Sequence, residues 1–272
     1  MIEMILAFVF GIVFGSFLNV VILRIPNDES IVFISSHCYS CNNKLKPWHN
    51  IPIFSWIFLR GKCAYCQANI SKQYPIIEFI SGILFAVLVQ KYSFSVPIIF
   101  IYLSFSMLLV LAMIDFKYKM IPDSINLLAI VFAILGAWNM EGFINNFQNA
   151  LLFAGGFTLL RFSLSYILTS SAHRVANKTL TPWTKHYQRY PYIEAMGEGD
   201  IMVAATMGAL LGTHLTLVAI FLSAVLALPV MVAVHNKSAE EQRVPFVPFL
   251  ALATFIVYIF DTPIKSFIEA NY

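Results

Sequence analysis

The chain has 272 residues, of which 59% are hydrophobic and only 11% are charged, and its mean hydropathy is +0.77. Soluble globular domains carry about 25% charged residues, so this composition excludes an ordinary water-soluble domain and is typical of a polytopic membrane protein. The net charge of +3 is too small to suggest a nucleic-acid partner, and we expect none.

Apolar runs suited to a hydrocarbon core of about 30 Å recur along the chain. Six are of good length and two are shorter. In chain order the six cover residues 4–23, 76–90, 96–115, 124–138, 149–169 and 215–234, and the shorter two cover 201–213 and 246–260. The sequence therefore predicts an all-α polytopic membrane protein with about eight transmembrane helices.

Basic residues gather in four segments between these runs. Residues 24–75, 116–123, 170–199 and 235–245 hold 14 of the 17 Lys and Arg residues. Because cytoplasmic loops carry such an excess, we expect these segments inside and the N-terminus outside. Glu3 before the first run and Arg24 after it favour an uncleaved anchor over a cleavable signal.

The first apolar run carries small and polar residues toward its end. Gly11, Gly15 and Ser16 predict a face that packs closely on another helix. For Asn19 we predict a hydrogen bond between helices, and a role in a functional site is the alternative. Pro26 then ends the helix, because proline cannot donate to a helical ladder.

All four cysteines lie in the first inside segment, in two C-x-x-C pairs separated by 21 residues. They are Cys38, Cys41, Cys63 and Cys66. Such pairs suit a tetrahedral zinc site with four thiolate ligands, and the reducing cytosol disfavours disulfides; free or redox-active thiols are the alternative. We predict a small zinc-stabilised cytosolic domain between helices one and two, because so short a segment has little core of its own.

Several polar residues nearby have ordinary structural interpretations. We expect His37 and His49 to be solvated loop side chains, since four cysteines already saturate the metal. Glu78 is predicted to complement the start of the second helix, with a direct site role as the alternative. Asp123 is predicted to be the N-cap of the fourth helix rather than a catalytic acid.

Two features further along the chain allow two interpretations each. Arg161 is either a charge partner within the bundle or a side chain that extends to the membrane surface. The polar, basic and aromatic segment 170–196 is predicted to be a solvated loop on the anionic inner leaflet, and guidance of a substrate is the alternative.

Two aspartates stand at the ends of apolar runs. Asp115 ends the run 96–115, and Asp200 follows Gly197 and Gly199 at the start of the run 201–213. A charged side chain at membrane depth costs at least roughly 2.5 kcal/mol. The short run after Asp200 covers about 18 Å, so we expect an irregular glycine turn that dips below the membrane surface.

Both aspartates are expected on the cytosolic side, where they can meet. Two carboxylates that lie close together do not both ionise easily, so one holds a proton while the other activates water, as in aspartic proteases. The alternative is that each is a charge at a helix end. A membrane zinc sensor or scaffold would leave both aspartates replaceable, and a proton-coupled transporter would need them but release no peptide.

Four stretches in combination resemble type IV prepilin peptidases. They are residues 15–21, the paired C-x-x-C segment with 50–56 and 59–61, residues 115–123 and residues 196–200, so that the likeness spans about 11–212. The resemblance implies a bifunctional enzyme of the bacterial inner membrane. Such an enzyme removes the short basic leader of prepilins or pseudopilins and methylates the new N-terminus using S-adenosylmethionine; a peptidase without methyltransferase activity is the alternative.

The resemblance also implies roles for particular residues. Asp115 and Asp200 match the catalytic aspartates, and Gly197 and Gly199 match the loop at the active site. The four cysteines match those of the cytosolic domain. The implied division is a first transmembrane helix over 1–23, a four-cysteine zinc domain associated with methyl transfer over 24–75, and a membrane peptidase domain over 76–272.

This chain departs from the family pattern at two places. Met202 stands where the family commonly has Lys, which removes a cation close to Asp200 in the sequence. The segment 170–196 is longer than is usual before the glycine motif. The partners expected for the protein are a prepilin or pseudopilin precursor and membrane lipid, at a site that faces the cytosol.

Overall fold

Helices form nearly all of the regular structure in the chain. The computed structural model describes residues 1–33, 35–137, 142–179, 194, 196–234 and 244–271, and these contain no strand beyond two isolated β-bridges. In chain order the helices are α1 (Ile2–Arg24), η1 (Ile25–Asn27), η2 (Pro47–Asn50), α2 (Phe54–Phe58), α3 (Gln73–Tyr92), α4 (Val96–Tyr118), α5 (Asp123–Gly136), α7 (Phe143–Thr179), α8 (Glu198–Val234), α9 (Val247–Ile259) and α10 (Asp261–Asn271). The predicted all-α class is confirmed.

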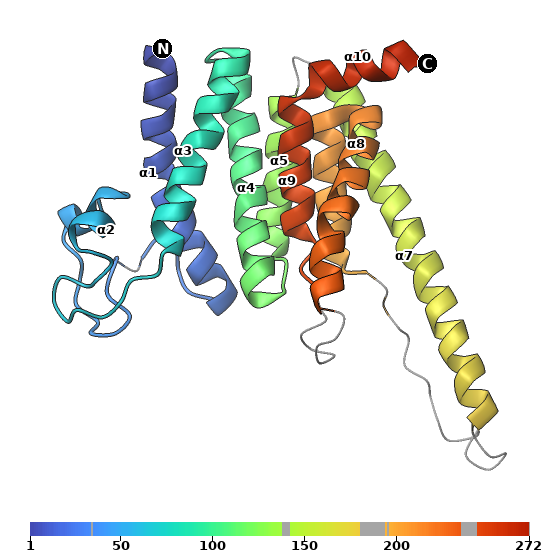
Figure 1. Cartoon of the computed structure of the whole chain (residues 1–272), viewed down its shortest axis with the longest axis horizontal. Coiled ribbons are helices and arrows are strands. Elements are labelled where there is room, and N and C mark those ends of the chain that lie inside the picture. Colours follow the sequence, from blue (N-terminus) through green and yellow to red (C-terminus); the bar gives the residue numbers. More distant parts are fainter. Residues whose placement is uncertain (34, 138–141, 180–193, 195, 235–243, 272) are drawn as a thin grey trace.

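The helices are long and apolar enough for a membrane protein. Among the described residues, α1, α3, α4, α7 and α8 each suit a membrane span, and α9 with α10, bent by 76° at their junction, makes a sixth. The shorter α5 is also apolar. Figure 1 shows the spans side by side, with both termini at one end of the bundle.

Helix α8 contains a reversal of the chain. Gly212 has φ 71° and ψ −174°, a conformation that glycine adopts without the strain a side chain would cause. In Figure 1 the ribbon turns back there, so that residues 198–211 and 213–234 form two antiparallel arms. Counted with both arms and with α5, the described chain has eight apolar segments, which match the eight predicted runs, and the break at Gly212 lies two residues before His214, where the predicted runs were divided.

Helix α7 differs most from the prediction. It begins at Phe143 rather than at residue 149 and continues to Thr179 rather than ending at 169. Residues 170–179 contain no Gly or Pro to stop a helix. The prediction of a solvated loop is therefore wrong for these ten residues, and most of the remaining segment, 180–193 and 195, lies outside the described residues.

Helices α1 and α3 pack closely through small residues. A Cβ atom on Gly11 would lie 2.7 Å from the Ser81 carbonyl oxygen, and one on Gly15 would lie 2.7 Å from the Glu78 Cα. Asn19, fully buried, donates from Nδ2 to the Tyr74 carbonyl at 3.1 Å. The predicted packing face and the predicted hydrogen bond between helices are both confirmed.

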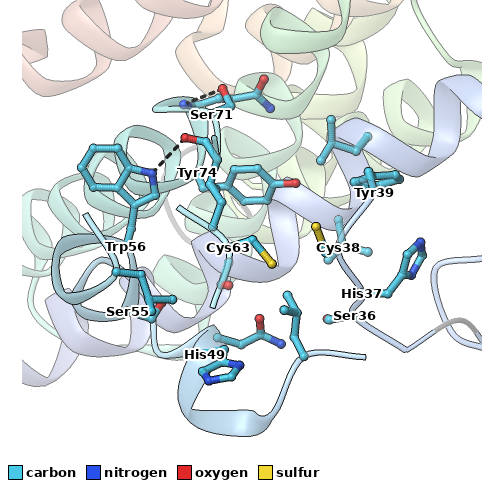
Figure 2. Close-up of a pocket in the computed structure, with 18 of the residues that line it drawn as sticks. Ser36, His37, Cys38, Tyr39, His49, Ser55, Trp56, Cys63, Ser71 and Tyr74 are labelled. Carbon is cyan, nitrogen blue, oxygen red and sulfur yellow. Dashed lines mark hydrogen bonds between the residues drawn. The ribbon is translucent and has the colours of Figure 1, made fainter. Parts of the chain in front are cut away.

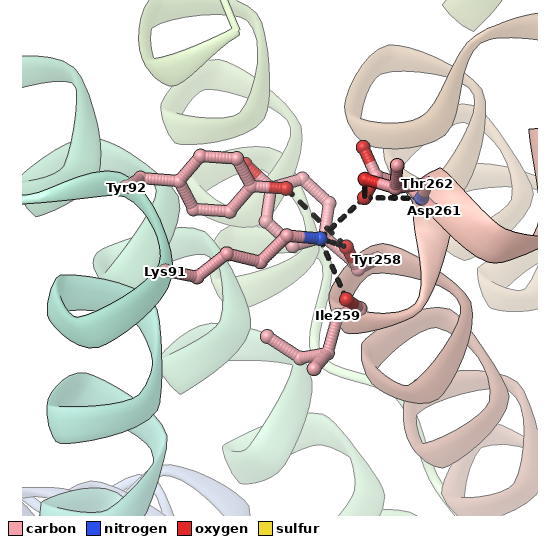
Figure 3. A network of polar contacts seen from close by, with 6 residues as sticks. All are labelled: Lys91, Tyr92, Tyr258, Ile259, Asp261 and Thr262. Carbon is pink, nitrogen blue, oxygen red and sulfur yellow. Dashed lines mark hydrogen bonds and ion pairs between the residues drawn. The ribbon is translucent and has the colours of Figure 1, made fainter.

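Lys91 of α3 ties that helix to α9 at the end of the bundle where the termini lie. Its Nζ donates to the carbonyls of Tyr258, at 3.0 Å, and Ile259, at 2.6 Å, and forms an ion pair with Asp261 (Figure 3). The last carbonyls of a helix have no partner within it, so a cation there satisfies the end of α9. This network holds the bend at which α10 begins.

Candidate functional site

Asp115 lies in the last turns of α4 and is 7% exposed. Its Oδ2 accepts a hydrogen bond from the Val247 amide at 3.1 Å. Val247 begins α9, whose first amides have no partner within the helix and carry its partial positive charge. The start of α9 therefore compensates a carboxylate that apolar surroundings would otherwise disfavour.

Asp200 is half-buried in the first turn of α8, where it interacts electrostatically with Asp115. Its carboxylate accepts a hydrogen bond from the Gly197 amide. A side chain at the third helical position that reaches back to the residue before the helix is one half of a capping box. The structure thus brings the two predicted aspartates to the same end of the bundle, here called the carboxylate end.

The predicted irregular turn at membrane depth is wrong. Helix α8 begins at Glu198, so Gly199 and Asp200 have helical backbones, and only Gly197 precedes the helix. Glycine is needed at 199 for another reason: a Cβ atom there would lie 2.6 Å from three side-chain carbons of Ile121. The chain between α4 and α5 therefore packs directly against the turn that carries Asp200.

Sequence reasoning missed Asn126, a fully buried residue in the first turn of α5. Its Nδ2 donates to the Gly199 carbonyl at 2.9 Å. A lone Asn near the start of an apolar run was the available signal. The predicted N-cap at Asp123 is wrong, because Pro122 occupies that position, no side chain caps the helix, and Asp123 is its first residue.

Arg161 connects α7 with the start of α8. Its guanidinium forms ion pairs with Glu198, at 2.9 Å, and Glu194, at 3.3 Å, while its own side chain is 16% exposed. Of the two interpretations left open by the sequence, the structure supports a charge partner within the bundle. Glu198 stands two residues before Asp200, so this pair also anchors the turn that carries the carboxylate.

The four cysteines converge in the cysteine loop, residues 25–72 between α1 and α3. Their sulfur atoms all lie within 4.8 Å of one another, and those of Cys38 and Cys66 are 3.8 Å apart. A tetrahedral zinc ion with Zn–S bonds of about 2.3 Å would set its sulfurs about 3.8 Å apart. The described residues contain no other such group of ligands, and this one fits a metal ion.

The two C-x-x-C pairs have the same backbone geometry. The Cys38 amide donates to the Asn43 carbonyl at 3.0 Å, and the Cys63 amide donates to the Ala68 carbonyl at 2.8 Å. In each turn the fourth residue after the first cysteine, Asn42 or Gln67, has a positive φ. An isolated β-bridge flanks each turn. Each pair is thus a preformed knuckle that presents two sulfurs to one point.

The thiols also affect one another's ionisation. The pKa of Cys38 is lowered to about 6, because the amides of Ser40 and Cys41 donate hydrogen bonds to its sulfur. The Ala68 amide lowers the pKa of Cys66, but desolvation and the neighbouring thiol groups of the cluster raise it to about 11. Negative charge therefore accumulates with difficulty on four sulfurs this close, and a bound cation would relieve that repulsion.

Glu78 has a different partner from the predicted one. It is 5% exposed, and its Oε2 accepts the Ile53 amide from the cysteine loop at 2.7 Å rather than an amide at the start of its own helix. It also lines a cavity of about 380 Å³ between the loop and the membrane helices (Figure 2).

The two histidines of the loop line the same cavity and are half-buried. Neither belongs to the group of metal-binding residues, as predicted. The prediction of solvated side chains is wrong for His49, because its Nδ1 is buried and has no hydrogen-bond partner.

Comparison with known proteins gives consistent matches along the chain. Residues 9–92 match the bacterial peptidase A24 N-terminal domain, and residues 101–232 match the type IV leader peptidase family. A prepilin leader peptidase/N-methyltransferase of Neisseria gonorrhoeae is 31% identical over 277 residues, which cover 93% of this chain and 89% of that protein. One of Bacillus subtilis is 29% identical over 263 residues, covering 96% and 95%. No solved structure matches.

Proposed function

This chain belongs to the type IV leader peptidase family, and we propose that it cleaves the leader peptide of prepilins or pseudopilins and N-methylates the new N-terminus. The observation that carries the proposal is that Asp115 and Asp200 lie at the carboxylate end, near enough to interact electrostatically, within the region that matches the peptidase family. The names of the relatives support both activities.

The two aspartates would divide the work of peptide hydrolysis. One ionised carboxylate takes a proton from water as the water oxygen attacks the carbonyl carbon of the scissile bond. The other, protonated, donates to the carbonyl oxygen, and the amine of the product then leaves with a proton. The amides of Val247 and Gly197 each hold one carboxylate in place, so the pair is positioned before substrate arrives.

We propose that the protein lies in the bacterial inner membrane with the carboxylate end toward the cytosol and the N-terminus outside. The distribution of Lys and Arg along the sequence supports this orientation. In this arrangement the cysteine loop is cytosolic, lipid surrounds the spans, and the chain divides into a first helix over 1–23, a four-cysteine domain over 24–75 and a peptidase domain over 76–272.

Zinc is the metal proposed for the four cysteines, because tetrahedral sulfur sites suit it and each knuckle is preformed. S-adenosylmethionine is the proposed methyl donor. It would supply an electrophilic methyl group to the new N-terminal amine, so the leader must be removed before methylation can occur.

Co-expression with a prepilin tests the function directly. Mass spectrometry of the recovered pilin is expected to show loss of the leader and gain of one methyl group at the new N-terminus. Retention of the leader would reject the peptidase and favour a transporter or scaffold. Loss of the leader without methylation would reject the methyltransferase alone.

Replacement of a cysteine ligand is expected to separate the two activities. Cys38→Ser leaves three thiolates, so the protein should lose zinc and the loop should loosen, because metal binding energy is folding energy there. Methylation should fall more than cleavage, since helices rather than the loop hold both aspartates. Elemental analysis of the purified protein measures bound zinc. Leader loss and methylation are then measured on the same prepilin.

Lys44→Ser is the matched control for this variant. Lys44 is exposed in the same knuckle and offers no ligand, so zinc and both activities should persist. Full methylation by a zinc-free Cys38→Ser protein would contradict a structural role for the metal. An equal collapse of both activities would mean that the loop and the aspartates act as one unit.

A further inference from the structure

The cavity behind the cysteine loop has the properties of a small-molecule site. Its volume of about 380 Å³ lies within the roughly 300–1,000 Å³ usual for such sites. One wall comes from the loop, with Cys38 and Cys63 (Figure 2), and the other from α1 and α3 and includes Glu78. A ligand here would be enclosed between the metal-binding loop and the membrane helices.

Two polar atoms at the cavity lack a partner. Among the described residues, four buried side-chain nitrogen or oxygen atoms make no hydrogen bond, and two of them, His49 Nδ1 and Gln73 Nε2, belong to residues that line this cavity. A buried donor left unsatisfied is costly, on the order of 1–3 kcal/mol. An unsatisfied buried polar group calls for an explanation, and a ligand that supplies the missing partner is one.

The remaining lining combines charge with aromatic surface. The Glu78 carboxyl group, which accepts hydrogen bonds from the Ile53 amide and the Ser16 hydroxyl, is the acidic group of the lining. The rings of Trp56 and Tyr74 form part of the wall and offer flat apolar surface. A carboxylate, unsatisfied polar groups and aromatic rings together suit a ligand that has a cationic centre and a planar heterocycle.

We propose that this cavity binds the methyl donor, a nucleoside sulfonium of the S-adenosylmethionine class, with Glu78 facing its positive charge and Gln73 donating to a polar atom of it. This inference rests on the proposed methyltransferase function and assigns that function a site. The donor's purine lies against the aromatic wall, and its sulfonium lies toward α3.

The position of the cavity suits an amine produced at the aspartates. Lys117, two residues after Asp115 on α4, also lines the cavity, so the two sites share the end of one helix. The cavity and the carboxylate end therefore both border the last turns of α4. The order of the reactions, cleavage first and methylation second, matches this arrangement.

Methyl transfer balances without any further reagent. The neutral N-terminal amine attacks the methyl carbon, an N–C bond forms and the C–S bond breaks. The bonding electron pair stays on sulfur, which leaves as a neutral thioether. The positive charge passes to the new secondary ammonium, which gives its proton to water. A carboxylate at Glu78 stabilises the charge on either side of the transfer.

Gln73→Leu is the first test, because it separates a ligand contact from a structural one. Removing an unsatisfied buried amide should raise the melting temperature of the ligand-free protein in nanodiscs. It should also weaken binding of S-adenosylhomocysteine, measured by calorimetry, about three- to tenfold. Gln90→Leu, the same change at an exposed position of the same helix, should leave both quantities unchanged.

Glu78→Gln is the second test, because it keeps the shape and removes the charge. Binding of sinefungin, which carries an additional amine near the position of the sulfonium, should weaken about ten- to a hundredfold. Binding of S-adenosylhomocysteine, whose sulfur is neutral, should weaken much less. If this variant does not fold, because Glu78 also holds the cysteine loop, Gln73→Leu decides alone.

The outcomes distinguish the two proposals. If the wild-type protein methylates a pilin and both variants bind both ligands normally, the assignment of this cavity is overturned and the proposed function remains. Wild-type protein that neither methylates nor binds either ligand would overturn the methyltransferase function, and the cavity assignment with it. Selective loss of sinefungin by Glu78→Gln would support both.

Discussion

Asp115→Asn and Asp200→Asn are each expected to abolish leader cleavage, a loss of at least about a hundred- to ten-thousandfold. An amide can neither accept the proton of the attacking water nor supply one to the carbonyl oxygen. Asn is close to Asp in size, and its carbonyl oxygen can still accept the Val247 or Gly197 amide. The variants should therefore fold, and loss of cleavage of a prepilin in detergent is the measurement.

Asp123→Asn is the matched control for this pair. Asp123 is an exposed carboxylate at the start of α5, only eight residues after Asp115, and it makes no cap. Its variant should cleave at the normal rate. Processing at that rate by Asp115→Asn or Asp200→Asn would exclude the aspartate pair as the catalytic group, because neither chemical role would then depend on a carboxyl.

The second large effect is expected at Gly199. In Gly199→Ala, the new Cβ would lie 2.6 Å from the Cβ, Cγ2 and Cδ1 atoms of Ile121, so either α8 or the chain before α5 must move. The neighbouring Asp200 moves with α8, and a misplacement of about 1 Å can cost a hundredfold in rate. We expect cleavage to fall at least about tenfold, and further in Gly199→Val.

Gly155→Ala supplies the comparison. Gly155 lies in α7, where an added Cβ would meet nothing within 4 Å, so its variant should be fully active. Both variants should retain zinc, because the cysteine loop is remote from α7 and α8 in the sequence. A Gly199→Ala protein with normal cleavage and normal thermal stability would show that the Ile121 contact does not position Asp200.

The features predicted well from the sequence are those set by local composition. Apolar runs of bilayer length predicted the spans, and the C-x-x-C spacing predicted convergence of Cys38, Cys41, Cys63 and Cys66. The aspartates were found because a carboxylate at the end of an apolar run needs compensation. Their placement at the same end of the bundle was predicted from topology, since the run 96–115 ends and the run 201–213 begins on the same side.

The features that escaped prediction depend on contacts between distant parts of the chain. The need for a glycine at position 199 could not be inferred without knowing that Ile121 packs against it. The glycine pattern alone suggested an irregular turn instead. Lys91 and Asp261, 170 residues apart, pair only because α3 and α9 end at the same level. The missing hydrogen-bond partners of Gln73 Nε2 and His49 Nδ1 likewise cannot be inferred from the sequence, because they depend on how the loop packs against the helices.

The helices around the aspartates are short, and this has a consequence for the surrounding lipid. Helix α9 has 13 residues and α5 has 14, so each covers about 20 Å, roughly 10 Å less than a typical hydrocarbon core. Both begin at the level of the carboxylates, where Val247 contacts Asp115. A bilayer responds to short spans by thinning. We therefore expect headgroups and water to approach the two carboxylates from that side of the membrane.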